Sequence, residues 1–262
     1  MSMPQFRPGD DPGASFAELL RRLGLDAPLA WSAESGAPEI PHATTCVAVR
    51  YNGGVIMAGD RRATAGNLIS HRTMEKVLPA DRLSGVAIAG AAGPAKEMVR
   101  LFQLQLEHYE KVEGQILSLE GKANQLSAML RNNLPAAMQG LVVVPIFAGW
   151  DIHRNVGRLF AYDVTGGQYE ERDVVATGSG SLHAGTVIRV GWREDLERDG
   201  AVELCVRALW QAADSDTATG GPDPLRGVYP TVATITTDGF QRIADDELAA
   251  RFAVIAAEAQ PR

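Results

Sequence analysis

The chain has 262 residues, 45% of them hydrophobic, so it can bury a full-sized core, and we expect one large domain. Its formal net charge of −7, without any block of Lys and Arg, argues against nucleic acid or an anionic membrane surface as a partner. No apolar run approaches the roughly 20 residues that span a bilayer, and residues 1–43 hold no secretory apolar core. These features predict a soluble cytoplasmic protein.

The two cysteines, Cys46 and Cys205, stand far apart in the sequence. This spacing does not fit a disulfide framework, a C-x-x-C redox pair or a cysteine zinc site. It is typical of a protein in a reducing compartment.

The first 43 residues differ from the rest in composition, since they hold six of the fourteen prolines. Residues 15–23 form one candidate helix, in which Phe16, Leu19, Leu20 and Leu23 share an apolar stripe. Two interpretations stay open for this helix: it docks on the body or on a neighbouring subunit, or it is a frayed tail.

From Thr44 onward the sequence is that of a folded body. Residues 44–50 and 55–59 are β-rich runs joined by Asn52-Gly53-Gly54, which predicts a hairpin. Further strands are predicted at 76–78, 83–89, 141–150, 157–163, 174–177 and 231–236, and helices along the stripes Val99–Tyr109 and Leu119–Leu130, at 182–190 and 202–213, and from Asp246. Runs of strands alternating with helix pairs favour a layered α+β body with helices outside.

Three polar residues lie near the starts and ends of these predicted strands. Thr44 begins the first strand, Asp60 follows the second, and Lys76 lies among apolar residues that would bury its stem. Thr44 and Thr45 also fit a strand start simply as β-formers. If the two hairpins stack in one sheet, Thr44, Asp60 and Lys76 converge, and the carboxylate would hold the lysine charged.

Six motifs in order resemble the β subunits of bacterial 20S proteasomes. They are Thr44-Thr45, Gly59-Asp60-Arg61-Arg62-Ala63-Thr64, Lys76, Ala89-Gly90, Gly178-Ser179-Gly180-Ser181 and Asp216-x-x-Thr219-Gly220-Gly221. The segments 106–111 and 218–223 further resemble the actinobacterial type. The resemblance runs from about His42 to the last helix.

The resemblance implies a threonine peptidase whose nucleophile is the side-chain oxygen of Thr44. Cleavage between Ala43 and Thr44 would remove residues 1–43 as a propeptide, leaving 44–262 as the catalytic domain. The freed α-amino group of Thr44 is a plausible general base, because the pKa of such a group is ordinarily about 7.7–8.0. Lys76 matches the family's active-site lysine, and Asp60 matches the aspartate that pairs with it.

The remaining catalytic positions are also implied by the resemblance. Asp216 and Ser179 match the acid and serine beside the threonine amine, and Thr219 stands where a serine or threonine completes that network. Gly90 matches the glycine whose backbone N–H faces the developing oxyanion.

Substrate, by the same resemblance, adds as an extended strand between the segments around Thr64 and Gly90–Ala92. Mostly apolar walls imply cleavage after hydrophobic or medium-sized residues, while Lys96 at the rim would admit acidic ones. The pocket positions that match are Ala63, Met74, Leu78, Ile88, Ala92 and Lys96.

The implied fold is the four-layer αββα sandwich of the N-terminal nucleophile hydrolases. The implied assembly is a pair of homoheptameric β rings between rings of α-type subunits, fed with tagged, unfolded proteins by a ring ATPase. No metal or organic cofactor is required. The sequence carries no G-x-x-x-x-G-K-[ST] loop and no complete calcium loop, which leaves open only a weakly held cation near Asp216.

One departure concerns the residue before the nucleophile, which is usually Gly in the family and is Ala43 here. An added methyl group restricts the backbone geometry that self-cleavage needs. Shifting the nucleophile to Thr45 would break the spacing to Asp60 and Lys76. This departure favours one alternative, a catalytically silent β-type subunit that stays unprocessed and only builds the ring. A second alternative is the simpler two-ring relative that pairs with a different ATPase, although the long leader and the segment 121–150 fit the proteasome type better.

Overall fold

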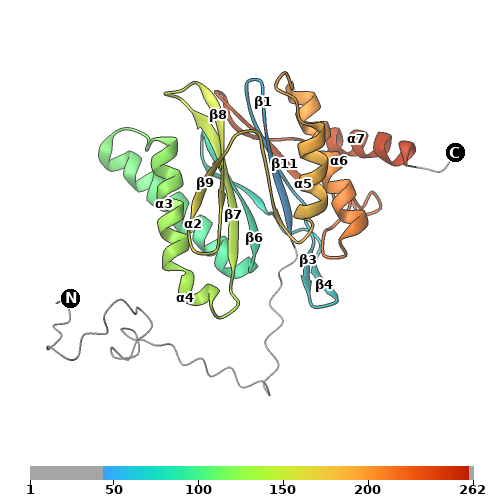
Figure 1. The fold of residues 1–262 in the computed structure, drawn as a ribbon, viewed down its shortest axis with the longest axis horizontal. Helices are drawn as coiled ribbons and strands as arrows, with labels where there is room; N and C mark the ends of the chain where they lie inside the picture. The colour runs from blue at the N-terminus through green and yellow to red at the C-terminus, as the bar shows by residue number, and fades with distance from the viewer. Residues whose placement is uncertain (1–43, 260–262) are drawn as a thin grey trace, which may run out of the picture. The chain divides into compact units, whose positions relative to one another are not determined.

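The computed structural model describes residues 44–259. The predicted helix at 15–23 and Ala43 lie outside these residues. Within 44–259, the chain forms two five-stranded antiparallel sheets that face each other, and a separate two-stranded hairpin (Figure 1).

The first sheet contains the N-terminal strand of the described chain at its interior. Its order is β10-β1-β2-β11-β12. The turn between β1 and β2 is Asn52-Gly53, and Gly53 has a φ of 100°, which a tight hairpin turn requires and glycine permits. Its strands are β1 (Thr45–Tyr51), β2 (Gly54–Gly59), β10 (Val174–Gly178), β11 (Thr231–Thr236) and β12 (Gly239–Arg242).

The second sheet is a simple meander in the order β5-β6-β7-β8-β9. Its strands are β5 (Val77–Asp81), β6 (Ser84–Gly90), β7 (Val143–Asp151), β8 (Val156–Tyr162) and β9 (Gln168–Glu171). The separate hairpin consists of β3 (Ala63–Ala65) and β4 (Leu68–His71), and every residue of β4 is exposed.

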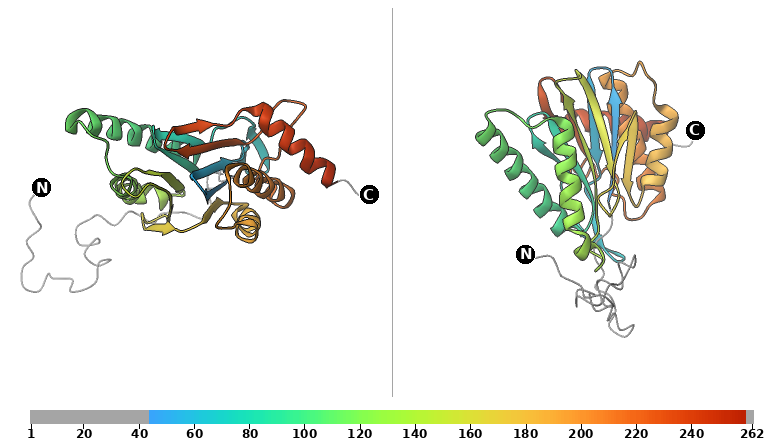
Figure 2. Two further views of the ribbon diagram at one scale, coloured as in Figure 1. Left: turned by 90° about the horizontal axis from the view of Figure 1, so that it is seen from above. Right: turned by 60° about the vertical axis from the view of Figure 1, so that its left-hand side comes forward.

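Helices cover the outer face of each sheet, which gives four layers in the order αββα (Figure 2). On the second sheet lie α2 (Ala92–Glu113) and α3 (Leu119–Asn132), followed by the short α4 (Leu134–Ala137). On the first sheet lie α5 (Ser181–Gly191) and α6 (Arg198–Ser215), and α7 (Asp245–Glu258) packs against α6. None of the described helices is long and apolar enough to cross a membrane.

The strands are apolar on both faces because helices cover one face of each sheet and the other sheet covers the second face. In β1, Val47 and Val49 pack in the cluster under α5 and α6, whereas Cys46 and Ala48 point into the cluster between the sheets. In β7, Phe147 points toward α2 and α3. Because successive side chains of a strand point to opposite faces, each sheet contributes to the core between the sheets and to the core under its own helices.

The sequence predictions for the main elements are confirmed, with one correction in how they combine. The predicted hairpins at 44–59 and 76–89 do not stack in one sheet; they belong to opposite sheets. Burial explains this arrangement, because both faces of each hairpin are apolar and each needs a covering layer on either side. Lys76 also precedes β5 rather than lying within a strand.

Five short elements lay outside the sequence predictions: β3, β4, β9, β12 and α4. They are three or four residues long, and β4 and β9 are largely exposed, so they carry no apolar alternation that sequence reasoning could detect.

We expect Phe147→Ala to destabilise the protein by about 3–5 kcal/mol, because the variant leaves a cavity in a fully packed layer. Phe147 is completely buried, and its ring centroid lies 5.8 Å from that of Phe102 and 5.9 Å from that of Phe160. The urea midpoint should fall with an unchanged m-value. The control Leu225→Ala, at a side chain 97% exposed, should stay within about 0.5 kcal/mol of the parent. Equal midpoints for both variants would contradict the packing argument.

Candidate active site

A buried ion pair joins the two sheets at one end of the sandwich. Asp60 directly follows β2 and Lys76 directly precedes β5, and Lys76 Nζ lies 2.6 Å from Asp60 Oδ1 with both side chains fully buried. Burying two charges is costly unless their remaining hydrogen-bonding capacity is used. Here Oδ1 also accepts from Thr45 N (2.8 Å), Oδ2 accepts from Arg62 N (2.9 Å) and Gly220 N (2.8 Å), and Lys76 donates to the Arg62 carbonyl at 2.5 Å.

Thr44 lies immediately before β1, and it is only 2% exposed. Its carbonyl oxygen accepts a hydrogen bond of 2.9 Å from Ser179 N. The next residue along β1, Thr45, pairs with Gly178 of β10. Gly178 has a φ of +99°, and a Cβ at this position would overlap the Thr44 carbonyl oxygen, so the close approach of the two strands requires glycine.

A second polar group gathers around Asp216, at the C-terminal cap of α6. Ser179 Oγ and Thr219 Oγ1 each donate to Asp216 Oδ2 at 2.6 Å, and Ala218 N donates to Oδ1 at 3.1 Å. Partial burial alone would raise the pKa of Asp216, but these hydrogen bonds, with a smaller contribution from His183, lower it below its ordinary value. Asp216 is therefore ionised at neutral pH.

Thr45 connects these two groups, and sequence reasoning gave it no part in the site. Its side chain lies 2.5 Å from Thr219 Oγ1 and accepts from Gly180 N at 2.9 Å, while its backbone N–H binds Asp60. The available signal was the second threonine of the pair, which a strand start explains equally well.

Gly90 ends β6 at the same end of the sandwich. Two contacts between the sheets fix this end: Cys46 Sγ donates to the Ile88 carbonyl at 3.6 Å, and Thr177 Oγ1 donates to the Val144 carbonyl at 3.3 Å. Gly90 has a φ of +106°, and a Cβ there would overlap the Val142 carbonyl oxygen. The helix α2 begins two residues later, so the positive end of its dipole lies beside Gly90. No acidic residue in the first turn of α2 offsets this partial charge.

The buried thiol of Cys46 lies close to the ion pair without competing as a nucleophile. Burial raises the pKa of Cys46 to about 12, although the charge of Lys76 works in the opposite direction. The thiol therefore stays protonated at neutral pH, and only the thiolate is strongly nucleophilic.

The positions predicted to contact substrate lie mainly on the side of α2. Ala63, Met74 and Ile88 belong to one buried cluster, and Leu78 and Ala92 pack against it. Thr64 lies on β3 and is 9% exposed, whereas Lys96 is exposed on α2. The apolar members thus come together, while Lys96 lies at the surface.

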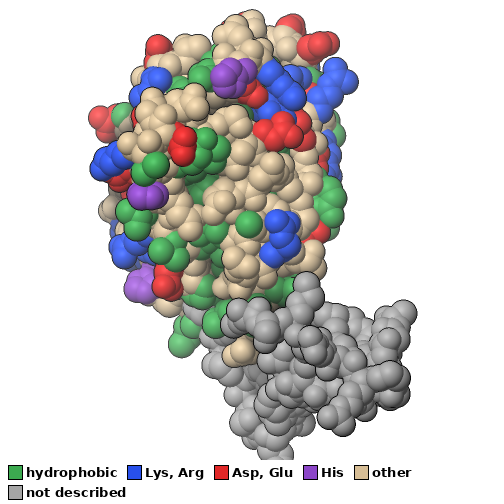
Figure 3. Space-filling view, turned by 90° about the vertical axis from the view of Figure 1, so that its left-hand side faces the viewer, with side chains coloured by type: hydrophobic (Ala, Val, Ile, Leu, Met, Phe, Trp, Pro, Cys, Tyr) green, Lys and Arg blue, Asp and Glu red, His purple; other side chains and the backbone are tan. Residues whose placement is uncertain are grey.

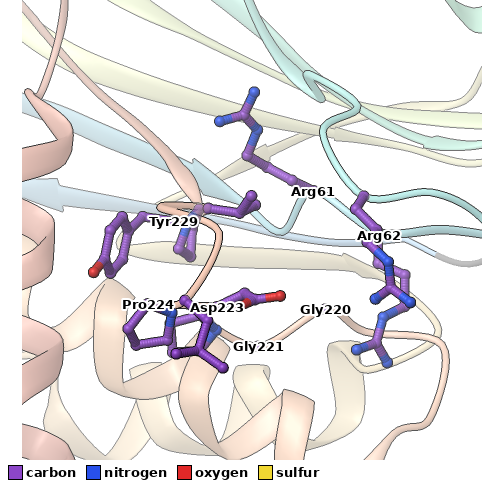
Figure 4. Close-up of a pocket in the computed structure, with 12 residues that line it drawn as sticks. Arg61, Arg62, Gly220, Gly221, Asp223, Pro224 and Tyr229 are labelled. Atoms are coloured by element: carbon purple, nitrogen blue, oxygen red, sulfur yellow. The ribbon is translucent and has the colours of Figure 1, made fainter.

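A pocket of about 240 Å³ lies between Arg61 and Arg62, which follow Asp60, and the loop that begins at Gly220 (Figure 4). Arg62 and Tyr229 lie on opposite sides of it, and the carboxylate of Asp223 points into the space between them. None of the predicted substrate positions lines this pocket.

Within the described part of the chain, no group of three or more His, Cys, Asp or Glu side chains is arranged to hold a metal ion. The polar groups described above are satisfied by protein atoms instead.

Two facing sheets between helix layers, with a threonine at the start of an interior strand, define the N-terminal nucleophile hydrolase fold that the sequence predicts. A sequence model of the family described as "Proteasome subunit" matches residues 40–223. The chain belongs to the proteasome subunit family.

Two relatives locate it within this family. The chain is 58% identical over 249 residues to "Proteasome subunit beta" of Acidimicrobium ferrooxidans, covering 95% of this chain and 91% of the relative. It is 59% identical over 212 residues to "Proteasome subunit beta" of Streptomyces griseus, covering 81% and 75%. The prediction of a catalytic β subunit of the 20S proteasome, a threonine peptidase, is confirmed, and the silent ring subunit is not favoured.

We expect Gly178→Ala to lower peptidase activity about 100-fold or more, because the added Cβ displaces the Thr44 carbonyl and so the start of β1. Gly185→Ala is the matched control in the helix that follows, since its Cβ would meet Ala176 Cβ at an ordinary 3.5 Å. The control should keep parental activity. Hydrolysis of a fluorogenic peptide by each assembled variant measures both, and parental activity in Gly178→Ala would refute the close-approach argument.

Proposed function

We propose that Thr44 is the nucleophile of peptide-bond hydrolysis and that the chain acquires it as a new N-terminus. The observation that carries this proposal is that both polar clusters bind the peptide group between Thr44 and Thr45. The Asp60–Lys76 pair accepts the N–H of Thr45, and Ser179, whose side chain binds Asp216, donates its backbone N–H to the Thr44 carbonyl.

The proposed reaction proceeds through an acyl-enzyme. Thr44 Oγ1 attacks the scissile carbonyl while its proton passes to the neutral α-amine of Thr44. The N–H of Gly90 stabilises the oxyanion of the tetrahedral intermediate. The α-ammonium then protonates the leaving amine as the C–N bond breaks, and an ester on Thr44 remains. Water hydrolyses this ester with the same amine as general base, which regenerates the hydroxyl group.

The charged residues have different roles in this scheme. Lys76 favours the neutral amine and a partly ionised hydroxyl group, and Asp60 pairs with Lys76 at 2.6 Å. Asp216, Ser179 and Thr219 orient the amine. These steps use groups of the chain alone, so no metal or organic cofactor takes part.

Maturation in this proposal removes residues 1–43 and leaves 44–262 as the peptidase. An internal threonine has no α-amine, so the precursor lacks the general base that the mature chain needs. The cut itself lies between Ala43 and Thr44.

Substrate is proposed to bind as an added strand between Thr64 and Gly90–Ala92, through main-chain hydrogen bonds that give loose sequence preference. The cluster that contains Ala63, Met74 and Ile88 supports cleavage after hydrophobic or medium-sized residues. Leu78 and Ala92 extend this apolar wall, and the exposed Lys96 supplies a positive charge near it.

The proposed assembly is α7β7β7α7, with homoheptameric β rings bound to rings of α-type subunits. Figure 3 faces the layer of α2 and α3, where apolar side chains lie exposed among charged ones. Leu101, Leu104 and Val112 of α2 are 47%, 61% and 65% exposed, a composition suited to a subunit contact. We further propose a cytoplasmic location, tagged unfolded proteins as substrates, and a ring ATPase that delivers them.

We expect the chain assembled with its α-type partner to begin at Thr44, and the Thr44→Ala variant to remain full length and inactive, because the variant lacks the attacking hydroxyl group. Intact mass and N-terminal sequencing measure the first property, and peptide hydrolysis measures the second. Full-length chains in both samples would favour the silent ring subunit. A Thr44→Ala variant with parental activity would exclude Thr44 as the nucleophile.

We expect Ala43→Gly to shorten the half-time of processing several-fold, because glycine reaches backbone conformations that alanine reaches only at a cost of about 1 kcal/mol. Intact mass followed over time after mixing with the α-type partner gives this half-time. Final peptidase activity should be unchanged, since residue 43 is absent from the mature chain. An equal or longer half-time would show that the methyl group of Ala43 does not limit the cut.

A further inference from the structure

Thr45 contacts both polar groups of the site. Its backbone N–H donates to Asp60 Oδ1, which also receives Lys76 Nζ. Its side chain is fully buried and bonds to Thr219, whose hydroxyl group reaches Asp216. The side chain of Thr45 thus extends the Asp216 group to the strand that carries the nucleophile.

The direction of each hydrogen bond in this chain of contacts can be assigned. Asp216 is ionised at neutral pH and only accepts, so Thr219 Oγ1 donates its single proton to it. Thr219 Oγ1 must then accept from Thr45 Oγ1, which in turn accepts from Gly180 N. The proton order runs from Gly180 N–H through two threonine hydroxyl groups to the carboxylate.

The same reasoning applies on the other side of the carboxylate. Ser179 Oγ donates its single proton to Asp216 at 2.6 Å, so this hydroxyl oxygen can only accept from any further neighbour. An amine on Thr44 would therefore donate to Ser179 and keep its lone pair for the hydroxyl proton of the nucleophile.

We propose that the hydroxyl group of Thr45 is a positioning residue for catalysis, which polarises the Thr219–Asp216 pair and fixes the start of β1 against both polar groups. This proposal rests on the proposed function of Thr44. Aligned hydrogen bonds strengthen one another in a low-dielectric interior. Removing the first hydroxyl group weakens the donation from Thr219 and leaves Gly180 N without its acceptor.

A change of this kind alters the protonation of the amine as well as its position. With weaker donation from Thr219, Asp216 retains more negative charge, and a nearby α-ammonium group is stabilised. The pKa of the amine then rises, and the active neutral form is reached at higher pH. Among the described residues, the titratable groups near this position include His183 on α5 and the Asp60–Lys76 pair.

The test compares three variants of the full chain assembled with its α-type partner. Thr45→Val keeps the shape and removes the hydroxyl group, whereas Thr45→Ser keeps the hydroxyl group. Thr231→Val is the matched control, because Thr231 is a buried strand threonine whose hydroxyl group has no hydrogen-bond partner among the described residues. Intact mass gives the fraction of chains that begin at Thr44, and kcat/KM across pH is expressed per processed chain.

We expect Thr45→Val to lose about tenfold in kcat/KM, the equivalent of one hydrogen bond of about 1.4 kcal/mol, with the acid limb of its profile at higher pH. Thr45→Ser and Thr231→Val should stay near the parent in both properties. If Thr45→Val fails to process while the other two variants mature, the proposal is also supported.

Two results would overturn the proposal. In one, Thr45→Val matches Thr231→Val in rate and pH profile; in the other, Thr45→Ser loses as much as Thr45→Val, so the hydroxyl group is not the cause. Both leave the proposed function intact as long as the parent is active and Thr44→Ala is not. A parent no more active than Thr44→Ala would instead refute the proposed function, and the role of Thr45 with it.

Discussion

The buried pair of Asp60 and Lys76 is the constraint on which the rest of the site depends. Two charges at 0% exposure would destabilise the fold if either lost its partners. Their hydrogen bonds come from β1, from the segment after β2 and from the loop after α6, which are distant in sequence. Each of these segments is consequently held in place by the same carboxylate. The pair thus gives a reason for the sandwich to close in one register at this end, since a shifted strand would leave a charge unsatisfied.

Close approach of backbones accounts for the glycines that surround this pair. At Gly178 and Gly90 a Cβ would overlap the carbonyl oxygens of Thr44 and Val142, and at Gly220 it would crowd Arg62 and Asp60 Oδ2. At Gly178 and Gly90 the left-handed φ adds a second requirement for glycine. These positions belong to different elements, so the tight geometry arises from the meeting of β10, β6 and the loop after α6 rather than from a single motif.

The fold and most of the polar residues that meet around Thr44 could be predicted from the sequence, because apolar periodicity marked the long strands and helices and ordered motifs marked these polar residues. The sheet assignment of Lys76 was wrong, since hairpin signals specify local pairing and leave open which sheet a hairpin joins. Thr45 was missed because a buried threonine on a strand has the same local signature whether or not its hydroxyl group is used. Its partners, Thr219 and Gly180, lie more than a hundred residues away, where no local pattern can register them.

The hydrogen-bond network around Thr44 has a consequence for how activity is switched on. Both polar groups are complete in a chain that still continues before Thr44, so the proposed cut need not assemble them. The cut gives the mature chain a single new ionisable group, an amine with an unperturbed pKa of about 7.7–8.0, while the new carboxyl group leaves with the released segment. Precursor and mature enzyme would then differ in the number of protons that they bind near neutral pH. Each cut would therefore change the proton uptake of the site as well as the mass of the chain.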